Sequence, residues 1–158
     1  LLSDYVASII AKRQSFAAIF HERITALYRQ IAHNDDSVSI AYSHNDTATS
    51  QQLLRQYEEK FDYDRVAGAT SVGPHRHDIH IIFNRVPAAQ AASRGECRTI
   101  VLAMKFIEAE YIEQQSGVPP IILLDDVFGE LDEQRQRALL AEFKANQVVM
   151  TSTASATT

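Results

Sequence analysis

Four consecutive aliphatic residues, 121–124, lead directly into two acids, Asp125 and Asp126. An unbroken apolar run of this length is typical of a strand that is buried on both faces of a parallel sheet. A helical pattern from about 132 to 143 follows, and then residues 147–150 are predicted to form a second buried strand. A strand, a helix and a strand in this order form a right-handed βαβ unit by default. The sequence therefore predicts an α/β fold with a parallel core.

The two acids stand where chemistry is expected in such a fold. In an open parallel sheet, a ligand lies beyond the carboxyl ends of the strands. A hard cation that bridges phosphates prefers carboxylate oxygens, so Asp125 is a candidate Mg ligand and Asp126 a candidate for polarising an attacking water. The alternative interpretation is that both acids cap the following helix or flank a turn. The pattern alone leaves both interpretations open.

A second candidate site lies at the start of the clearest predicted helix, residues 93–115, which Gly117 ends. The unpaired backbone N–H groups and the helix dipole at this start favour a phosphate. Ser93 and Glu96, however, also have the spacing of a capping box, which satisfies the same donors internally. A glycine in the first turn weakens a helix, so Gly95 favours the close approach of a ligand or partner.

The rest of the chain has weaker signals, taken from apolar periodicity and turn residues. They predict a helix over 1–31, a turn over 33–37, a strand over 38–42, a helix from about 47 to 61 with Asp46 as its N-cap, short strands over 71–75 and 79–83, and a turn at 84–85. No capping residue precedes Leu1, which suggests that further sequence precedes the first helix. We divide the chain into a helical arm, 1–67, which includes the short strand near 38–42, and a C-terminal lobe, 68–158.

Composition restricts the function. The net charge of -5 and the pI near 5.6 argue against a continuous basic surface for duplex DNA, so any DNA contact must come from a local patch. No stretch is apolar over the roughly 18 residues that a membrane-spanning helix needs. The single cysteine, Cys97, cannot form an internal disulfide, which fits a reducing cytoplasm. No GxxxxGK[ST] loop occurs, so this chain lacks the element that cradles nucleotide phosphates.

Three stretches in order give the chain a family resemblance. They are Val72-Gly73-Pro74-His75-Arg76, Ser93-Arg94-Gly95-Glu96-Cys97-Arg98, and IILLDDVFGELD at 121–132. Together they resemble the RecF family of DNA replication and repair proteins, relatives of the SMC and Rad50 branch of ABC ATPases. The resemblance is clearest over about 70–151. It implies the C-terminal lobe of an ABC-type ATPase head, with an attached helical arm.

The same resemblance implies roles for individual residues. Asp125 and Asp126 become a Walker B pair, with Asp125 on Mg and Asp126 catalytic. The residues implied to bind ATP are Ser93, Gly95 and Glu96 of the signature motif, Asp132 of the D-loop, and Thr151 at the place of the ABC switch histidine. The signature residues would contact the γ-phosphate of ATP held by the other subunit, and the D-loop would cross the dimer interface. Two positions depart from the family pattern: Glu96 stands where glutamine is common, and His77 where an acid is common.

For the whole protein, the resemblance implies an ATP-dependent homodimer with a weak DNA-dependent ATPase activity. It would load at DNA gaps or single-strand to double-strand junctions, with RecR and RecO as partners in recombinational repair, replication and the SOS response. The chain alone should be inactive. The alternatives are a non-enzymatic α/β interaction module or another SMC-type ATPase. A weaker hypothesis places a metal site at His75, His77, Asp78 and His80, because alternate strand residues share a face.

Overall fold

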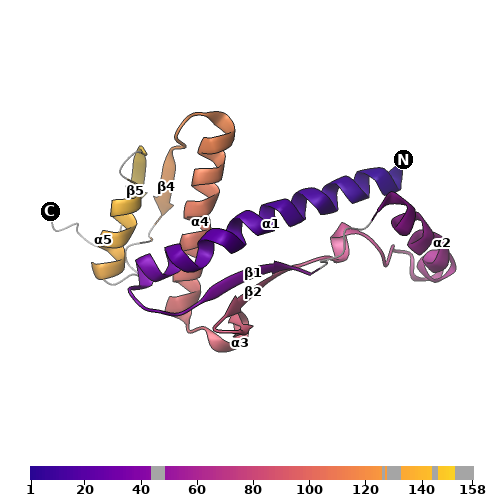
Figure 1. The fold of residues 1–158 in the computed structure, drawn as a ribbon, viewed down its shortest axis with the longest axis horizontal. Helices are drawn as coiled ribbons and strands as arrows, with labels where there is room; N and C mark the ends of the chain where they lie inside the picture. Colours follow the sequence, from indigo (N-terminus) through magenta and orange to yellow (C-terminus); the bar gives the residue numbers. More distant parts are fainter. Residues whose placement is uncertain (44–48, 126, 128–132, 144–145, 152–158) are drawn as a thin grey trace. The chain divides into compact units, whose positions relative to one another are not determined.

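The computed structural model describes residues 1–43, 49–125, 127, 133–143 and 146–151. The chain divides into two compact units. The first unit comprises Leu1–His21 and Ile40–Ile81, and the second comprises Glu22–Ser39 and Ile82–Thr158. The elements are, in chain order (Figure 1), α1 (Leu2–Ala32), β1 (Val38–Tyr42), α2 (Ser50–Ala67), the 3₁₀ turn η1 (Pro74–Arg76), β2 (Ile79–Phe83), β3 (Val86–Pro87), α3 (Ala88–Ala91), α4 (Arg94–Ser116), β4 (Ile122–Asp125), α5 (Glu133–Glu142) and β5 (Val148–Thr151).

Helix α1 confirms the helix that apolar periodicity predicts at the start of the chain. Its buried residues recur at helical spacing: Val6, Ile10, Ala17 and Phe20 in the first unit, and Ile24, Leu27, Tyr28 and Ile31 in the second. The helix ends before His33, which adopts a φ of 52°. Strand β1 follows as predicted, and its alternating residues Val38, Ile40 and Tyr42 are buried.

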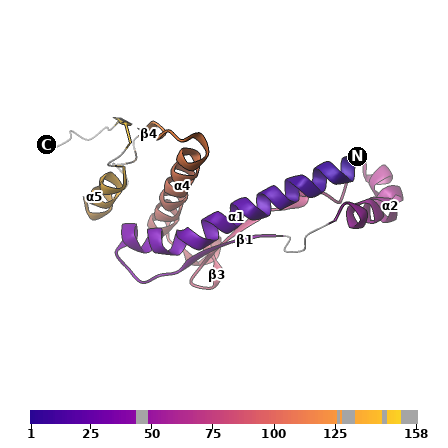
Figure 2. The ribbon, with the colours of Figure 1, turned by 45° about the horizontal axis from the view of Figure 1, so that its top comes forward.

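In the first unit, α2 lies beside the N-terminal part of α1 in both ribbon views (Figures 1 and 2). The predicted helix exists, but the predicted cap is wrong: the N-cap is Thr49, not Asp46. The Thr49 hydroxyl accepts the backbone N–H of Gln52 at 3.2 Å, and the Gln52 side chain accepts the Thr49 N–H at 2.9 Å. This reciprocal capping box satisfies two helix-start donors at once, which a lone aspartate does not.

The strand predicted over 71–75 is also wrong, because Pro74–Arg76 forms the 3₁₀ turn η1. Gly73 precedes it with a φ of 136°, in the region that favours glycine. Pro74 has no N–H to donate to a strand ladder. Its carbonyl oxygen accepts instead from Arg13 Nη1 of α1 at 2.6 Å. A contact across 61 positions of sequence therefore fixes the conformation of this segment.

Strands β1, β2 and β3 form a sheet in that order, and β2 and β3 pair antiparallel. In the second unit, Phe83 pairs with Val86 across a two-residue turn at Asn84 and Arg85, which confirms the predicted turn. Both turn residues have positive φ, 48° and 69°, as the favoured two-residue hairpin turns require. The Asn84 side chain accepts from the Ser37 N–H at 2.9 Å and so connects the hairpin to the start of β1.

The C-terminal part of the second unit contains the predicted strand, helix and strand. Helix α4 runs from the N-cap Ser93 to Gly117, whose φ of 71° makes a left-handed C-cap. Strands β4 and β5 pair parallel, as predicted, with Ile122 opposite Val148 and Asp125 opposite Thr151. The fold is therefore α/β, with its parallel strands joined through α5.

One prediction about β4 is wrong, because the strand is not buried on both faces. Leu124 is 8% exposed, whereas Leu123, which points to the opposite face, is 74% exposed. Within the second unit, Phe106 of α4 stacks on Phe143 with ring centroids 4.2 Å apart. Both rings are buried, at 5% and 7% exposure. In the described part of the chain, no helix is long and apolar enough to span a membrane.

Candidate functional site

The carboxyl end of the parallel pair brings together two of the predicted site residues, Asp125 and Thr151. The strand register places them opposite each other, and the Thr151 hydroxyl donates to Asp125 Oδ1 at 2.5 Å. Both side chains are exposed to solvent. Hydrogen bonding to Oδ1 restricts the carboxylate, and Oδ2 accepts no further hydrogen bond from the described residues. An exposed, oriented carboxylate at this edge has the donor chemistry that Mg prefers.

Two further predicted site residues, Asp126 and Asp132, lie outside the described residues. The same holds for the rest of the predicted D-loop, residues 130–132. Their roles, Asp126 as the catalytic residue that polarises water and Asp132 as an interface residue, remain predictions. Helix α5, which starts at Glu133, is the first described element after them.

The start of α4 brings together Ser93 and Glu96 as a complete capping box. The Ser93 hydroxyl accepts from the Glu96 N–H at 3.3 Å, and Glu96 Oε2 accepts from the Ser93 N–H at 2.6 Å. The Glu96 carboxylate thus binds a backbone donor of its own chain. The Ser93 hydroxyl is exposed and uses only its acceptor capacity here, so its O–H remains able to donate to an anion. Capping and anion binding are therefore compatible at Ser93.

Gly95, in the first turn of α4, faces α5. A Cβ atom added at Gly95 would lie 3.7 Å from Arg135 Nη1, an ordinary contact distance, and would meet nothing closer. The fold of this chain therefore has room for a side chain at Gly95. Among the described residues, none leaves too little room for a Cβ atom at Gly95.

Sequence reasoning missed a buried phenol next to this helix start. Tyr28 of α1 has no exposed surface, and its ring meets Phe83 edge-on with centroids 5.8 Å apart. Burial raises the pKa of Tyr28, and the charge of Glu96 raises it further. The buried Tyr28 hydroxyl has no hydrogen-bond partner among the described residues. Periodicity predicts only a packing residue at Tyr28, and no local motif reveals the neighbouring charges.

The predicted histidine metal site does not form. In the described residues, no three His, Cys, Asp or Glu side chains come together in a way that could hold a metal ion. His77 Nδ1 instead shares a hydrogen bond with the Tyr42 hydroxyl at 2.8 Å, and His75 Nε2 lies 3.0 Å from the Thr70 carbonyl oxygen. The 3₁₀ turn η1 replaces the predicted strand, so the alternation that would align these side chains is lost.

Comparisons with known proteins give one consistent result. No family model matches the chain. The chain is 33% identical over 161 residues to the DNA replication and repair protein RecF of Geobacter sulfurreducens, covering 96% of this chain and 44% of that protein. It is 34% identical over 140 residues to RecF of Lactococcus lactis, covering 88% of this chain and 38% of that protein. The chain thus spans less than half the length of these relatives.

Solved structures agree with the sequence relatives. The structure of the recombination mediator protein RecF-ATP in the RecFOR pathway matches with a TM-score of 0.84 and 26% identity, over 99% of this chain and 44% of that one. The corresponding RecF-ATPrS structure matches with a TM-score of 0.81 and 27% identity, over 98% of this chain and 43% of that one.

Proposed function

We propose that this chain, which matches the C-terminal part of the DNA replication and repair protein RecF, supplies part of an ATP site that a second subunit completes. The observation that carries the proposal is the position of Asp125. Its carboxylate lies at the carboxyl end of a parallel strand pair, where α/β proteins bind ligands, and Thr151 hydrogen-bonds to it.

In this proposal, Asp125 holds Mg and Thr151 positions the Asp125 carboxylate. Asp126 is the catalytic residue whose carboxylate polarises the attacking water. Mg bound between phosphate oxygens neutralises negative charge during phosphoryl transfer. Thr151 stands at the place of the ABC switch histidine, but its hydroxyl is neutral and donates a single hydrogen bond, so it cannot supply the positive charge that a protonated histidine can.

The signature motif supplies the other half of the proposed site. Ser93 donates its hydroxyl hydrogen to the γ-phosphate of ATP held by the partner subunit, and the first-turn N–H groups of α4 contribute partial positive charge. Gly95 lets the phosphate approach the backbone. Glu96 keeps the cap on α4, and any direct ATP contact from it remains a prediction. Asp132 crosses the subunit interface with the D-loop.

For the complete protein, we propose ATP-dependent dimerisation on DNA, preferentially at gaps and single-strand to double-strand junctions. RecR and RecO are the proposed partners, in the cytoplasm. ATP hydrolysis, weak and DNA-dependent, releases the dimer. The arm (1–67) and the ATPase lobe (68–158) are the proposed functional parts of the chain. The chain has no GxxxxGK[ST] loop, so we expect it to be inactive alone.

Ser93→Arg in the complete protein tests the composite site. We expect it to abolish ATP-driven dimerisation, because the large side chain blocks the partner's phosphate, while each subunit still binds nucleotide. Ser116→Arg, at the other end of α4, is the matched control and should dimerise normally. In a mixed dimer, one Ser93→Arg subunit should disable only the nucleotide site of its partner. Wild-type dimerisation by a folded Ser93→Arg protein would reduce Ser93 to a helix cap.

A further inference from the structure

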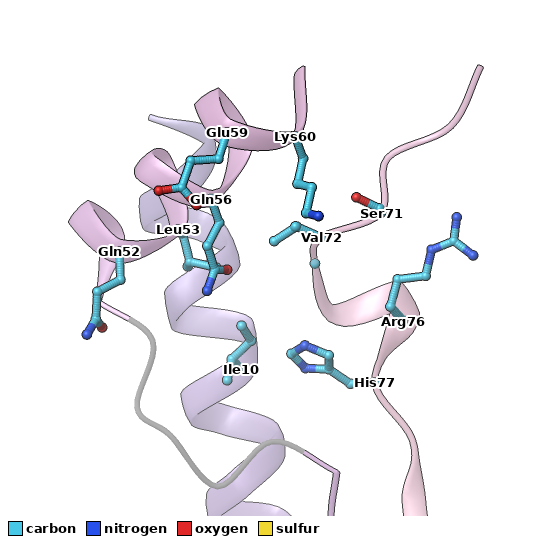
Figure 3. Close-up of a pocket in the computed structure, with 11 residues that line it drawn as sticks. Ile10, Gln52, Leu53, Gln56, Glu59, Lys60, Ser71, Val72, Arg76 and His77 are labelled. Carbon is cyan, nitrogen blue, oxygen red and sulfur yellow. The ribbon is translucent and has the colours of Figure 1, made fainter. Parts of the chain in front are cut away.

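The first unit contains a pocket of about 520 Å³ that has no role in the proposed ATP site. Helix α2 lines one side, the segment around η1 lines the other, and Ile10 of α1 forms part of the base (Figure 3). The polar lining includes two cations, Lys60 and Arg76, and one acid, Glu59; the other polar lining residues are Gln52, Gln56, Ser71 and His77.

The η1 side of the pocket is held in place by contacts that leave little freedom. Arg13 donates to the Pro74 carbonyl oxygen, and the Ser71 N–H donates to Asp64 Oδ1 at 3.0 Å. A Cβ atom at Gly73 would lie 3.0 Å from His75 Nδ1, too close for an ordinary contact. Glycine at Gly73 therefore allows the chain to turn tightly along the pocket wall.

The two cations of the pocket differ in the contacts that they already make. In the part of the chain that the structure describes, no ion pair or hydrogen bond involves Lys60, and its side chain is exposed. Arg76 donates from Nε and Nη2 to the Thr70 carbonyl oxygen, at 3.1 and 3.0 Å, which leaves Nη1 for another acceptor. The one acid among the lining residues, Glu59, already pairs with Arg55 at 3.1 Å. The pocket therefore carries an excess of positive charge in an acidic chain.

Ser71 supplies an independent sign of a ligand. Its Oγ atom is buried and has no hydrogen-bond partner in the part of the chain that the structure describes. A buried hydroxyl without a partner costs roughly 1–3 kcal/mol, so a bound acceptor would stabilise this arrangement. Figure 3 shows the Lys60 ammonium group and the Ser71 hydroxyl directed toward the same part of the pocket. An anion placed there would meet a positive charge and an O–H donor together.

We propose that this pocket binds a phosphate group of a DNA strand. The inference rests on the proposed function, since it assigns a contact for the DNA binding proposed there. A tetrahedral anion uses several donors at once, which suits the Lys60 ammonium group and the Ser71 hydroxyl. The net charge of -5 leaves DNA contacts to local patches, and this pocket is such a patch. Its volume also exceeds that of a single phosphate, which leaves room for the adjoining sugar.

The test compares Lys60→Gln with Lys12→Gln in the complete protein. Lys12 is an exposed lysine of α1 in the same unit that does not line the pocket. Fluorescence anisotropy with gapped DNA, at several salt concentrations, gives Kd and its salt slope. We expect Lys60→Gln to weaken binding about 3- to 10-fold and to reduce the slope of log K against log salt by about 1. Lys12→Gln should match wild type in both quantities.

Ser71→Ala separates ligand binding from folding. We expect it to weaken DNA binding without lowering the free energy of unfolding, because it removes an unpaired buried hydroxyl. A purely structural serine would show the reverse result.

Unchanged affinity and salt slope for Lys60→Gln would overturn the proposal. ATP-dependent dimerisation, measured in parallel, distinguishes failure of the pocket assignment from failure of the proposed function. If wild type dimerises with ATP and binds DNA but Lys60→Gln behaves like Lys12→Gln, only the pocket assignment fails. If wild type binds no DNA, the proposed function fails with it.

Discussion

Replacing Gly95 with alanine should separate the requirements of the fold from those of the proposed ATP site. A Cβ at Gly95 meets only Arg135 Nη1, at 3.7 Å, so the chain accommodates alanine without strain. Alanine also loses less conformational freedom than glycine when a helix forms. We therefore expect Gly95→Ala to raise the free energy of unfolding by about 0.5–1 kcal/mol.

Gly117 provides the matched control on the same helix. Its φ of 71° is a conformation that alanine adopts only with strain, so Gly117→Ala should lower the free energy of unfolding by roughly 1 kcal/mol. Urea denaturation of the chain measures both changes. With a slope of about 2 kcal/mol/M, the unfolding midpoint should rise by roughly 0.3–0.5 M for Gly95→Ala and fall by about 0.5 M for Gly117→Ala.

For Gly95→Ala, we expect ATP-driven dimerisation to fall although the free energy of unfolding rises. If a partner's phosphate approaches the backbone at Gly95, the added methyl group obstructs it, and ATP-driven dimerisation of the complete protein falls despite the greater stability. Sedimentation velocity with and without ATP measures this. A stabilised Gly95→Ala protein that dimerises as wild type would refute the argument that glycine is needed there for a ligand. A destabilised protein would refute the packing argument.

Four further predictions concern ATP binding, hydrolysis, pH-dependent stability and helix capping. The chain alone should bind ATP weakly or not at all by calorimetry, because it lacks the phosphate-cradling loop, and micromolar affinity would reveal an unrecognised site. Asp126→Asn in the complete protein should keep Mg-ATP binding and slow hydrolysis, so that the ATP-bound dimer persists; unchanged turnover would favour the capping role. Burial raises the folded-state pKa of Tyr28 above 10.0, so stability present below pH 10 should fall as the pH rises further, and Tyr28→Phe should reduce that fall in pH-dependent urea titrations. Thr49→Ala should cost about 1 kcal/mol of unfolding free energy, whereas Asp46→Ala should cost little; equal losses would argue against the capping box at Thr49.

Local sequence signals were sufficient for the helix that carries the signature motif. Ser93, Glu96 and Gly117 mark the ends of α4 through interactions that span only a few residues, and the structure places each as predicted. The order of β4, α5 and β5 also follows from local patterns, because two short apolar runs separated by a helical period have few compact arrangements. Asp125 at the end of its strand could therefore be identified from the sequence.

The errors arose where a distant contact outweighs the local preference. Residues 71–75 look like a strand, but Arg13 binds the Pro74 carbonyl and stabilises a 3₁₀ turn. The run at 121–124 looks buried on both faces, although Leu123 is 74% exposed, because burial depends on what packs against each face. The local sequence does not reveal that Arg13 contacts Pro74, nor what packs against each face of β4.

By itself, the sequence determined the four longer helices α1, α2, α4 and α5, the parallel strand order and the acid at the end of β4. The tertiary structure alone decided that Thr151 holds Asp125, that Tyr28 lies among charges, and that Lys60 and Ser71 share a pocket. The physical reason is the range of the interactions. Helix capping and apolar periodicity depend on residues within a turn or two of the chain. The Thr151–Asp125 contact, the surroundings of Tyr28 and the pocket of Lys60 and Ser71 instead form only when separate segments pack together in the fold.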